Sequence, residues 1–153
     1  MLLRACGNGV QKYICTASTT GTKFSPPVPH VILLEGDRDE GDLVAIHFAG
    51  PTWQALDGST VVGDISTVQI APASDPDGVP WLRLNAKSNG GTGVLSRMAY
   101  IQQLYADGGK APAGGCDQAH IQAEVLVEYS GQYFFTVLQL NNNSSAVKLT
   151  RAD

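Results

Sequence analysis

A strict alternation of apolar and polar side chains is the feature that most restricts how this chain can fold. Within residues 121–129 every second residue is apolar, and Gln122, Glu124 and Glu128 lie between them. Successive side chains of a β-strand point to opposite faces, so the pattern predicts a strand with one face in a core and the other in water. An amphipathic helix would need apolar residues three and four positions apart.

Short runs of the same kind recur along the chain, separated by Asp-Gly, Gly-Gly and proline-rich segments that are typical of turns. The other predicted strands are Val10–Ala17, Val31–Leu34, Asp42–Phe48, Ser66–Ala71, Trp81–Ala86, Tyr133–Leu140 and Ala146–Thr150. With 17 glycines and no long helical pattern, these runs predict an all-β protein. We expect one domain over residues 1–153, an antiparallel β-barrel or β-sandwich of about eight strands.

One segment, Ser96–Tyr105, fits two patterns. Met98 and Ile101 have a helical spacing, whereas Val94, Met98 and Tyr100 also fit an alternation. We favour a strand here.

Composition excludes several classes of protein. The 153 residues are 43% hydrophobic and 16% charged, a balance typical of a compact domain rather than of a disordered chain. A net charge of -4 without a cluster of Lys and Arg argues against nucleic-acid binding. The longest apolar runs are too short to span a bilayer, so a soluble protein is expected. No phosphate-binding glycine loop is present, and we expect no cofactor.

Three cysteines, Cys6, Cys15 and Cys116, lack the close spacing of metal-binding motifs, and no metal is expected. A bridge between Cys15 and Cys116 would tie a predicted strand to a Gly/Pro-rich loop. We predict this disulfide, with Cys6 outside it; the alternative is three buried thiols.

Two overlapping N-glycosylation sequons begin at Asn142 and Asn143. With the predicted disulfide they point to secretion or the secretory pathway. Met1–Cys6 is no signal peptide, so the alternative is a cytoplasmic protein.

The segment from His47 to Ser59 holds an imidazole, an indole and a carboxylate in one Gly/Pro-bent connection between two predicted strands. An imidazole exchanges protons near neutral pH, and a carboxylate can orient it. We therefore predict His47 and Asp57 as catalytic residues, brought together by a bend at Gly50 and Pro51.

Four further residues are predicted to bind a substrate or ligand. Trp53, Trp81 and Tyr100 would supply flat apolar walls, and Ser59 a hydroxyl. The alternative is structural: His47 hydrogen-bonds a loop carbonyl, and the two tryptophans fill the core.

A set of short motifs in a fixed order gives the chain a family resemblance. They are Tyr13-Ile14-Cys15, His47, Gly50-Pro51-Thr52-Trp53-Gln54, Asp57-Gly58-Ser59, Pro80-Trp81-Leu82, Ile101-Gln102, Gly108-Gly109-Lys110-Ala111-Pro112 and Cys116. With these motifs the chain resembles the domain of unknown function 3455 of fungi, plants and bacteria, from about Val10 to Phe135. Members are often secreted and sometimes labelled malate dehydrogenase, although no dinucleotide-binding strand-turn-helix occurs here.

The chain departs from that family pattern at three places. Gln103 stands where an arginine is usual, Tyr105-Ala106 replaces an Asn-Thr pair, and Lys23–Pro29 lacks the usual tryptophan. These departures indicate a specialised pocket.

Two functions of different class follow. The first is a cofactor-independent enzyme of secondary metabolism, in which His47 assists dehydration, isomerisation or cyclisation of an apolar conjugated substrate. By analogy with small fungal all-β proteins, the cyclisation could be of the hetero-Diels-Alder type. The alternative is a secreted, non-catalytic module that binds a glycan or an apolar metabolite. A small molecule is the expected partner, and a homodimer is left open.

Overall fold

The computed structural model describes residues 2–37, 40–140 and 147–148. Its strands are β1 (Leu2–Ser18), β2 (Gly21–Phe24), β3 (Val28–Glu35), β4 (Leu43–Phe48), β5 (Thr52–Ala55), β6 (Thr60–Ala71), β7 (Trp81–Gly90), β8 (Met98–Gly108), β9 (Glu124–Val137), β10 (Gln139–Leu140) and β11 (Val147–Lys148). A single 3₁₀ turn, Gln118–His120, is the helical element among the described residues.

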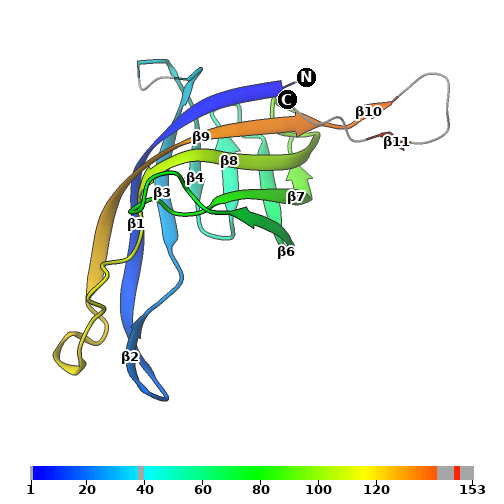
Figure 1. Cartoon of the computed structure of the whole chain (residues 1–153). Helices are drawn as coiled ribbons and strands as arrows, with labels where there is room; N and C mark the ends of the chain where they lie inside the picture. Colours follow the sequence, from blue (N-terminus) through cyan, green and yellow to red (C-terminus); the bar gives the residue numbers. More distant parts are fainter. Residues whose placement is uncertain (1, 38–39, 141–146, 149–153) are drawn as a thin grey trace.

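The main sheet closes on itself. From β3 to β9 each strand pairs antiparallel with the next along the chain, and β1 pairs with both β3 and β9. Figure 1 shows β1 in blue beside β9 in orange, where Leu3 lies opposite Phe135. Strands β1 and β3–β9 thus form a ring, while β2 extends the sheet as a hairpin with β1. The all-β, antiparallel prediction is confirmed.

Several element boundaries differ from the predicted ones. The ambiguous segment Ser96–Tyr105 lies largely in β8, so the choice of strand is confirmed. The two runs predicted on either side of Ser130 form one long strand, β9. Strands β2 and β5 were not predicted, because four residues are too few to display a periodicity. Of the last predicted strand, Ala146–Thr150, only Val147 and Lys148 are among the described residues.

The barrel interior combines large aromatic side chains with glycines that leave room for them. A Cβ atom at Gly7 would overlap the ring of Tyr133, and one at Gly131 would overlap the hydroxyl of Tyr129. Trp53 lies edge-on to both Tyr133 and Phe135, at centroid distances of 6.2 and 6.0 Å. These rings fill the middle of the barrel, as small and large residues together do in small barrels.

A disulfide joins Cys15 to Cys116, as predicted. It connects the end of β1 to the long loop between β8 and β9. Among the described residues, no helix is long and apolar enough to cross a membrane.

Candidate functional site

An apolar cavity of about 480 Å³ occupies one end of the barrel interior. It lies at the end that holds the turn between β4 and β5, the start of β3 and the start of β7. Its apolar lining residues are Tyr13, Pro26, Pro27, Pro29, Pro51, Trp53, Ile65, Val68, Ile70, Val79, Pro80, Leu82, Leu84 and Ala111. Its polar lining residues are Gln11, His47, Gln103 and Lys110.

An irregularity in β6 forms a lip over the mouth of this cavity. Asp64 pairs with Asn85 and Gln69 with Arg83, so residues 65–68 lie opposite Leu84 alone. The extra residues leave the sheet and carry Ile65 and Val68 to the cavity mouth, where Ile65 is 63% exposed.

Local hydrogen bonds stabilise the lip. Oδ1 of Asp64 accepts hydrogen bonds from the backbone N–H and the hydroxyl of Ser66. The Thr67 hydroxyl donates to the Asp64 carbonyl and accepts the backbone N–H of Asn85 at 2.9 Å. The lip is thus a defined turn, and its exposed apolar side chains lie over the entrance to an apolar cavity.

His47 lies at the inner end of the cavity, stacked on Trp53. The two residues are partners across β4 and β5, and their rings are parallel within 3° at a centroid distance of 4.3 Å. Tyr133 packs edge-on to the imidazole at 5.5 Å. Nδ1 of His47 lies 2.9 Å from the carbonyl oxygen of Thr52. A carbonyl can only accept a hydrogen bond, so Nδ1 carries the proton and Nε2 has a lone pair.

Burial keeps this imidazole neutral. Loss of solvation lowers the pKa of His47 from 6.5 to about 4, and the bond to Thr52 opposes the shift only partly. At neutral pH, His47 is therefore a hydrogen-bond acceptor through Nε2 rather than a cation. Part of the structural alternative is found, since His47 bonds a carbonyl and Trp53 is a core residue, yet both also line the cavity.

The predicted approach of Asp57 to His47 is not found. The chain reverses at Gly50 and Pro51 as expected, but β5 then carries it back, so Asp57 lies at the opposite end of the barrel. There its carboxylate accepts the backbone N–H and hydroxyl of Ser59 and the backbone N–H of Val94. The convergence expected between His47 and Asp57 occurs instead between His47 and Trp53.

Ser59 belongs to the same structural network as Asp57. Its hydroxyl oxygen also accepts the backbone N–H of Leu95 at 3.0 Å, and its side chain is fully buried. Neither Ser59 nor Asp57 lines the cavity described above.

Trp81 and Tyr100 also lie away from the cavity, on the other face of the sheet. Trp81 precedes the cavity-lining Leu82, so strand alternation turns its indole outward, edge-on to Tyr105 at 5.1 Å. The register shifts between Met98 and Tyr100, and Tyr100 packs under the guanidinium of Arg83 at 4.2 Å. Of the three aromatic residues predicted to bind a ligand, only Trp53 therefore lines the cavity that contains His47.

Two cavity residues, Gln11 and Gln103, were not predicted as site residues. Both are buried glutamines on the inward face of a strand. Gln11 and Gln103 could have been identified because each is a polar residue at a strand position where the alternation calls for an apolar, inward-facing one. In Val10–Ala17 the inward positions are those of Gln11, Tyr13 and Cys15.

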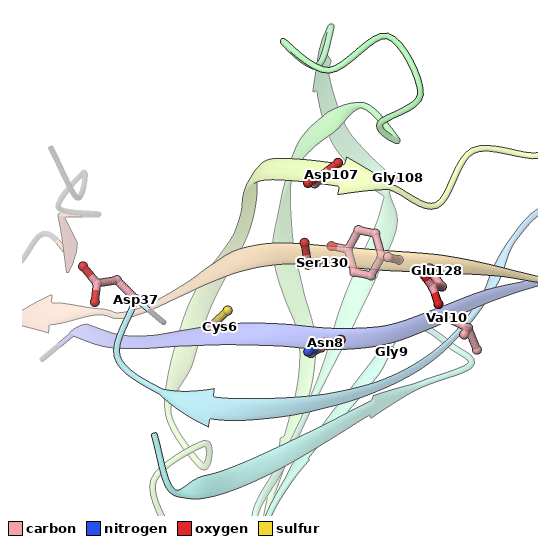
Figure 2. Close-up of a pocket in the computed structure, with 10 residues that line it drawn as sticks. Cys6, Asn8, Gly9, Val10, Asp37, Asp107, Gly108, Glu128 and Ser130 are labelled. Carbon is pink, nitrogen blue, oxygen red and sulfur yellow. The ribbon is translucent and has the colours of Figure 1, made fainter. Parts of the chain in front are cut away.

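A second, more open depression lies on the outer side of β1 and β9 (Figure 2). Cys6, Asn8 and Val10 line it from β1, and Asp107 and Glu128 bring carboxylates from β8 and β9. No group of three or more metal-ligating side chains occurs in the described part of the chain. Because its lining is more polar, this depression offers less apolar surface to an organic molecule than the barrel cavity does.

The predicted sequons fall outside the described residues. Asn142 and Asn143 lie between β10 and β11, in the part of the chain for which no structure is given.

Fold and cavity together define a class: a closed antiparallel β-barrel with an apolar cavity at one end. Residues 27–136 match the family described as Protein of unknown function (DUF3455), and the chain belongs to this family. No curated protein and no solved structure matches the chain.

Proposed function

We propose that this protein binds an uncharged, largely apolar small molecule in the barrel cavity, between His47 and the lip of β6. The observation that carries the proposal is the cavity itself: about 480 Å³, with mostly aliphatic, proline and aromatic walls. Ligand pockets have this size and this character, with a few polar groups that orient the ligand.

The cavity lining has almost no charged side chains, and for this reason we propose an uncharged ligand. Lys110 is the only Lys, Arg, Asp or Glu among the described residues that line the cavity, and it is exposed, with its Nζ 3.3 Å from the Pro76 carbonyl. His47 is neutral at physiological pH. A carboxylate or ammonium group at the inner end would therefore be desolvated without a counter-charge.

Naphthalene, an uncharged apolar probe, tests the proposal by ligand-observed NMR. Leu82→Trp should fill the cavity and abolish binding, because Leu82 is a lining residue. Leu126→Trp makes the same change on the outer face of β9, where Leu126 is 61% exposed, and should leave binding intact. Absence of binding to the wild-type protein, or equal binding by both variants, would contradict the proposal.

A second candidate is the cofactor-independent enzyme, a dehydratase, isomerase or cyclase. The observation in its favour is the Nε2 lone pair of His47 at the inner end of a cavity that would hold a flexible substrate in one conformation. The low pKa makes His47 a weak base, so this candidate is better suited to a cyclisation that needs orientation and one hydrogen bond than to proton abstraction. Conversion of a bound conjugated compound, lost in His47→Ala, would support the enzyme, whereas recovery of unchanged ligand supports binding alone.

We also propose a secreted or secretory location. The Cys15–Cys116 disulfide supports it, because such bonds persist in oxidising compartments. The mass of the peptide that holds Asn142 and Asn143, before and after N-glycosidase treatment of protein from its natural source, checks whether the sequons are used. An unmodified peptide and a cytosolic fraction rich in the protein would contradict this location.

A further inference from the structure

A chain of buried hydrogen bonds fixes which way Gln103 points. The hydroxyls of Tyr129 and Tyr133 are 2.9 Å apart, and the Tyr133 hydroxyl lies 3.2 Å from the side-chain oxygen of Gln103. All three residues are buried. Burial raises the pKa of both tyrosines, so each phenol keeps its proton and must place it on an acceptor.

Only one direction of the chain satisfies both phenol protons. If Tyr129 donates to Tyr133 and Tyr133 donates to the oxygen of Gln103, each proton has an acceptor. If the Gln103 amide were turned to donate to Tyr133, one of the two phenol protons would have no acceptor within this chain of three groups. The amide oxygen of Gln103 is therefore occupied from within the core, and its NH₂ group remains to donate into the cavity that Gln103 lines.

His47 offers a hydrogen-bond acceptor to the cavity, whereas Gln103 offers a donor, and the tautomer of His47 is also fixed by a hydrogen bond. Its Nδ1–H donates to Thr52, which leaves Nε2 as an acceptor without a hydrogen-bond partner among the described residues. The indole Nε1 of Trp53 also lacks a partner among the described residues, but protein atoms cover it completely, so a ligand cannot reach it. The His47 and Gln103 atoms are not covered in this way. The Gln11 amide has no described partner and can turn either end to a ligand.

We propose that the cavity selects uncharged molecules that carry both a hydrogen-bond donor for Nε2 of His47 and a carbonyl-type acceptor for the NH₂ group of Gln103. This inference rests on the proposed function, ligand binding in the barrel. The chemical class is that of lactams, enols and hydroxycarbonyl compounds with an apolar body. An apolar molecule without these groups would leave both polar atoms unpaired, which carries an energetic cost.

Three probes of similar size test this class. Naphthalene has no polar group, N-methyl-2-quinolone has an acceptor alone, and 2-quinolone has an acceptor and an N–H donor. One additional hydrogen bond corresponds to roughly a tenfold change in Kd. We expect 2-quinolone to bind about ten times more tightly than its N-methyl analogue, and the analogue to bind more tightly than naphthalene.

Variants assign each preference to one residue. His47→Phe should reduce the ratio between the two quinolones to about one, and Gln103→Met should weaken both relative to naphthalene. Gln102→Met is the matched control, because Gln102 is the neighbouring glutamine of β8 and does not line the cavity, and it should leave the ratio of the two quinolones unchanged. In the wild-type protein, the ¹⁵N shift of His47 Nε2 should move on addition of 2-quinolone and much less with the N-methyl analogue, a readout that does not depend on a variant folding.

The outcomes separate this inference from the proposed function. If naphthalene binds as tightly as 2-quinolone, the proposed function stands and the selectivity for a donor and an acceptor is wrong. If the ratio between the quinolones persists in His47→Phe, the methyl group acts by size, and the inference is again wrong. If no probe binds, the proposed function itself is wrong.

Discussion

His47 connects the chemistry of the cavity to the stability of the barrel. Its pKa is lowered from 6.5 to about 4, so between these values the unfolded chain binds a proton that the folded protein does not. The stability that comes from keeping His47 neutral is fully present above about pH 6.5 and is lost as pH falls toward 4. The expected loss over this window is about 3 kcal/mol.

Urea unfolding at pH 7, 5.5 and 4 checks this dependence. His47→Phe is the control, because it removes the titrating group while keeping a flat ring against Trp53. The difference in unfolding free energy between wild type and variant should shrink by about 3 kcal/mol from pH 7 to pH 4. A constant difference would mean that His47 does not titrate with a depressed pKa.

Ser59 illustrates a polar residue whose buried position is structural. Its hydroxyl is the acceptor for the backbone N–H of Leu95 in the described structure, so Ser59→Ala leaves that donor without a partner. The cost of such an unpaired buried group is about 1 to 3 kcal/mol. Denaturant unfolding should show this loss, while the affinity for naphthalene stays unchanged; an affinity loss would instead restore the predicted role in ligand binding.

Two aspartates, Asp57 and Asp64, organise turns at opposite ends of the barrel and make a matched pair of variants. Asp64→Ala removes the acceptor for Ser66 and should loosen the lip of β6, which raises the Kd for naphthalene roughly three- to tenfold. Asp57→Ala removes the same kind of turn at the opposite end of the barrel. It should lower the thermal midpoint and leave the Kd unchanged. Equal effects of both variants on the Kd would show that the lip has no particular part in binding.

Strand alternation predicted the fold well and the site only in part. The runs around Val31, Trp81 and Val125 correspond to β3, β7 and β9. Such runs can be recognised because a strand with one buried and one exposed face has alternating apolar and polar residues. The position of Asp57 could not be predicted in the same way, because the four-residue strand β5 intervenes and is too short to show a pattern.

Tyr100 and Gln103 show the second reason for the incomplete prediction. A register shift between Met98 and Tyr100 changes which residues of β8 face inward. The sequence around these residues has no pattern from which such a bulge could be predicted. Counting from Met98 in steps of two would place Tyr100 inside and Gln103 outside, the reverse of what is found. The direction of the Gln103 amide depends on Tyr129 and Tyr133, which are close to it only in the folded chain.

The disulfide joins segments 101 residues apart and should make a large contribution to stability. In the chain-entropy treatment, a closed loop of this length contributes about 4 to 5 kcal/mol. The double variant Cys15→Ala, Cys116→Ala should lose stability of this order in urea unfolding under non-reducing conditions. Alkylation of the unfolded wild-type protein without reductant should label Cys6 alone, and three labelled thiols would contradict the bridge.

The pairing of β1 with β9 also determines when the protein can fold during synthesis. Leu3 of β1 pairs with Phe135 of β9. One edge of β1 therefore stays unpaired during synthesis until nearly all of the described barrel has left the ribosome. Contacts this distant in sequence are slow to form, and open strand edges favour association with other chains in the meantime. We expect nascent chains that end before β9 to remain sensitive to protease and to aggregate. Chains that include β9 should become resistant in a single late step, which pulse proteolysis of stalled ribosome complexes would detect.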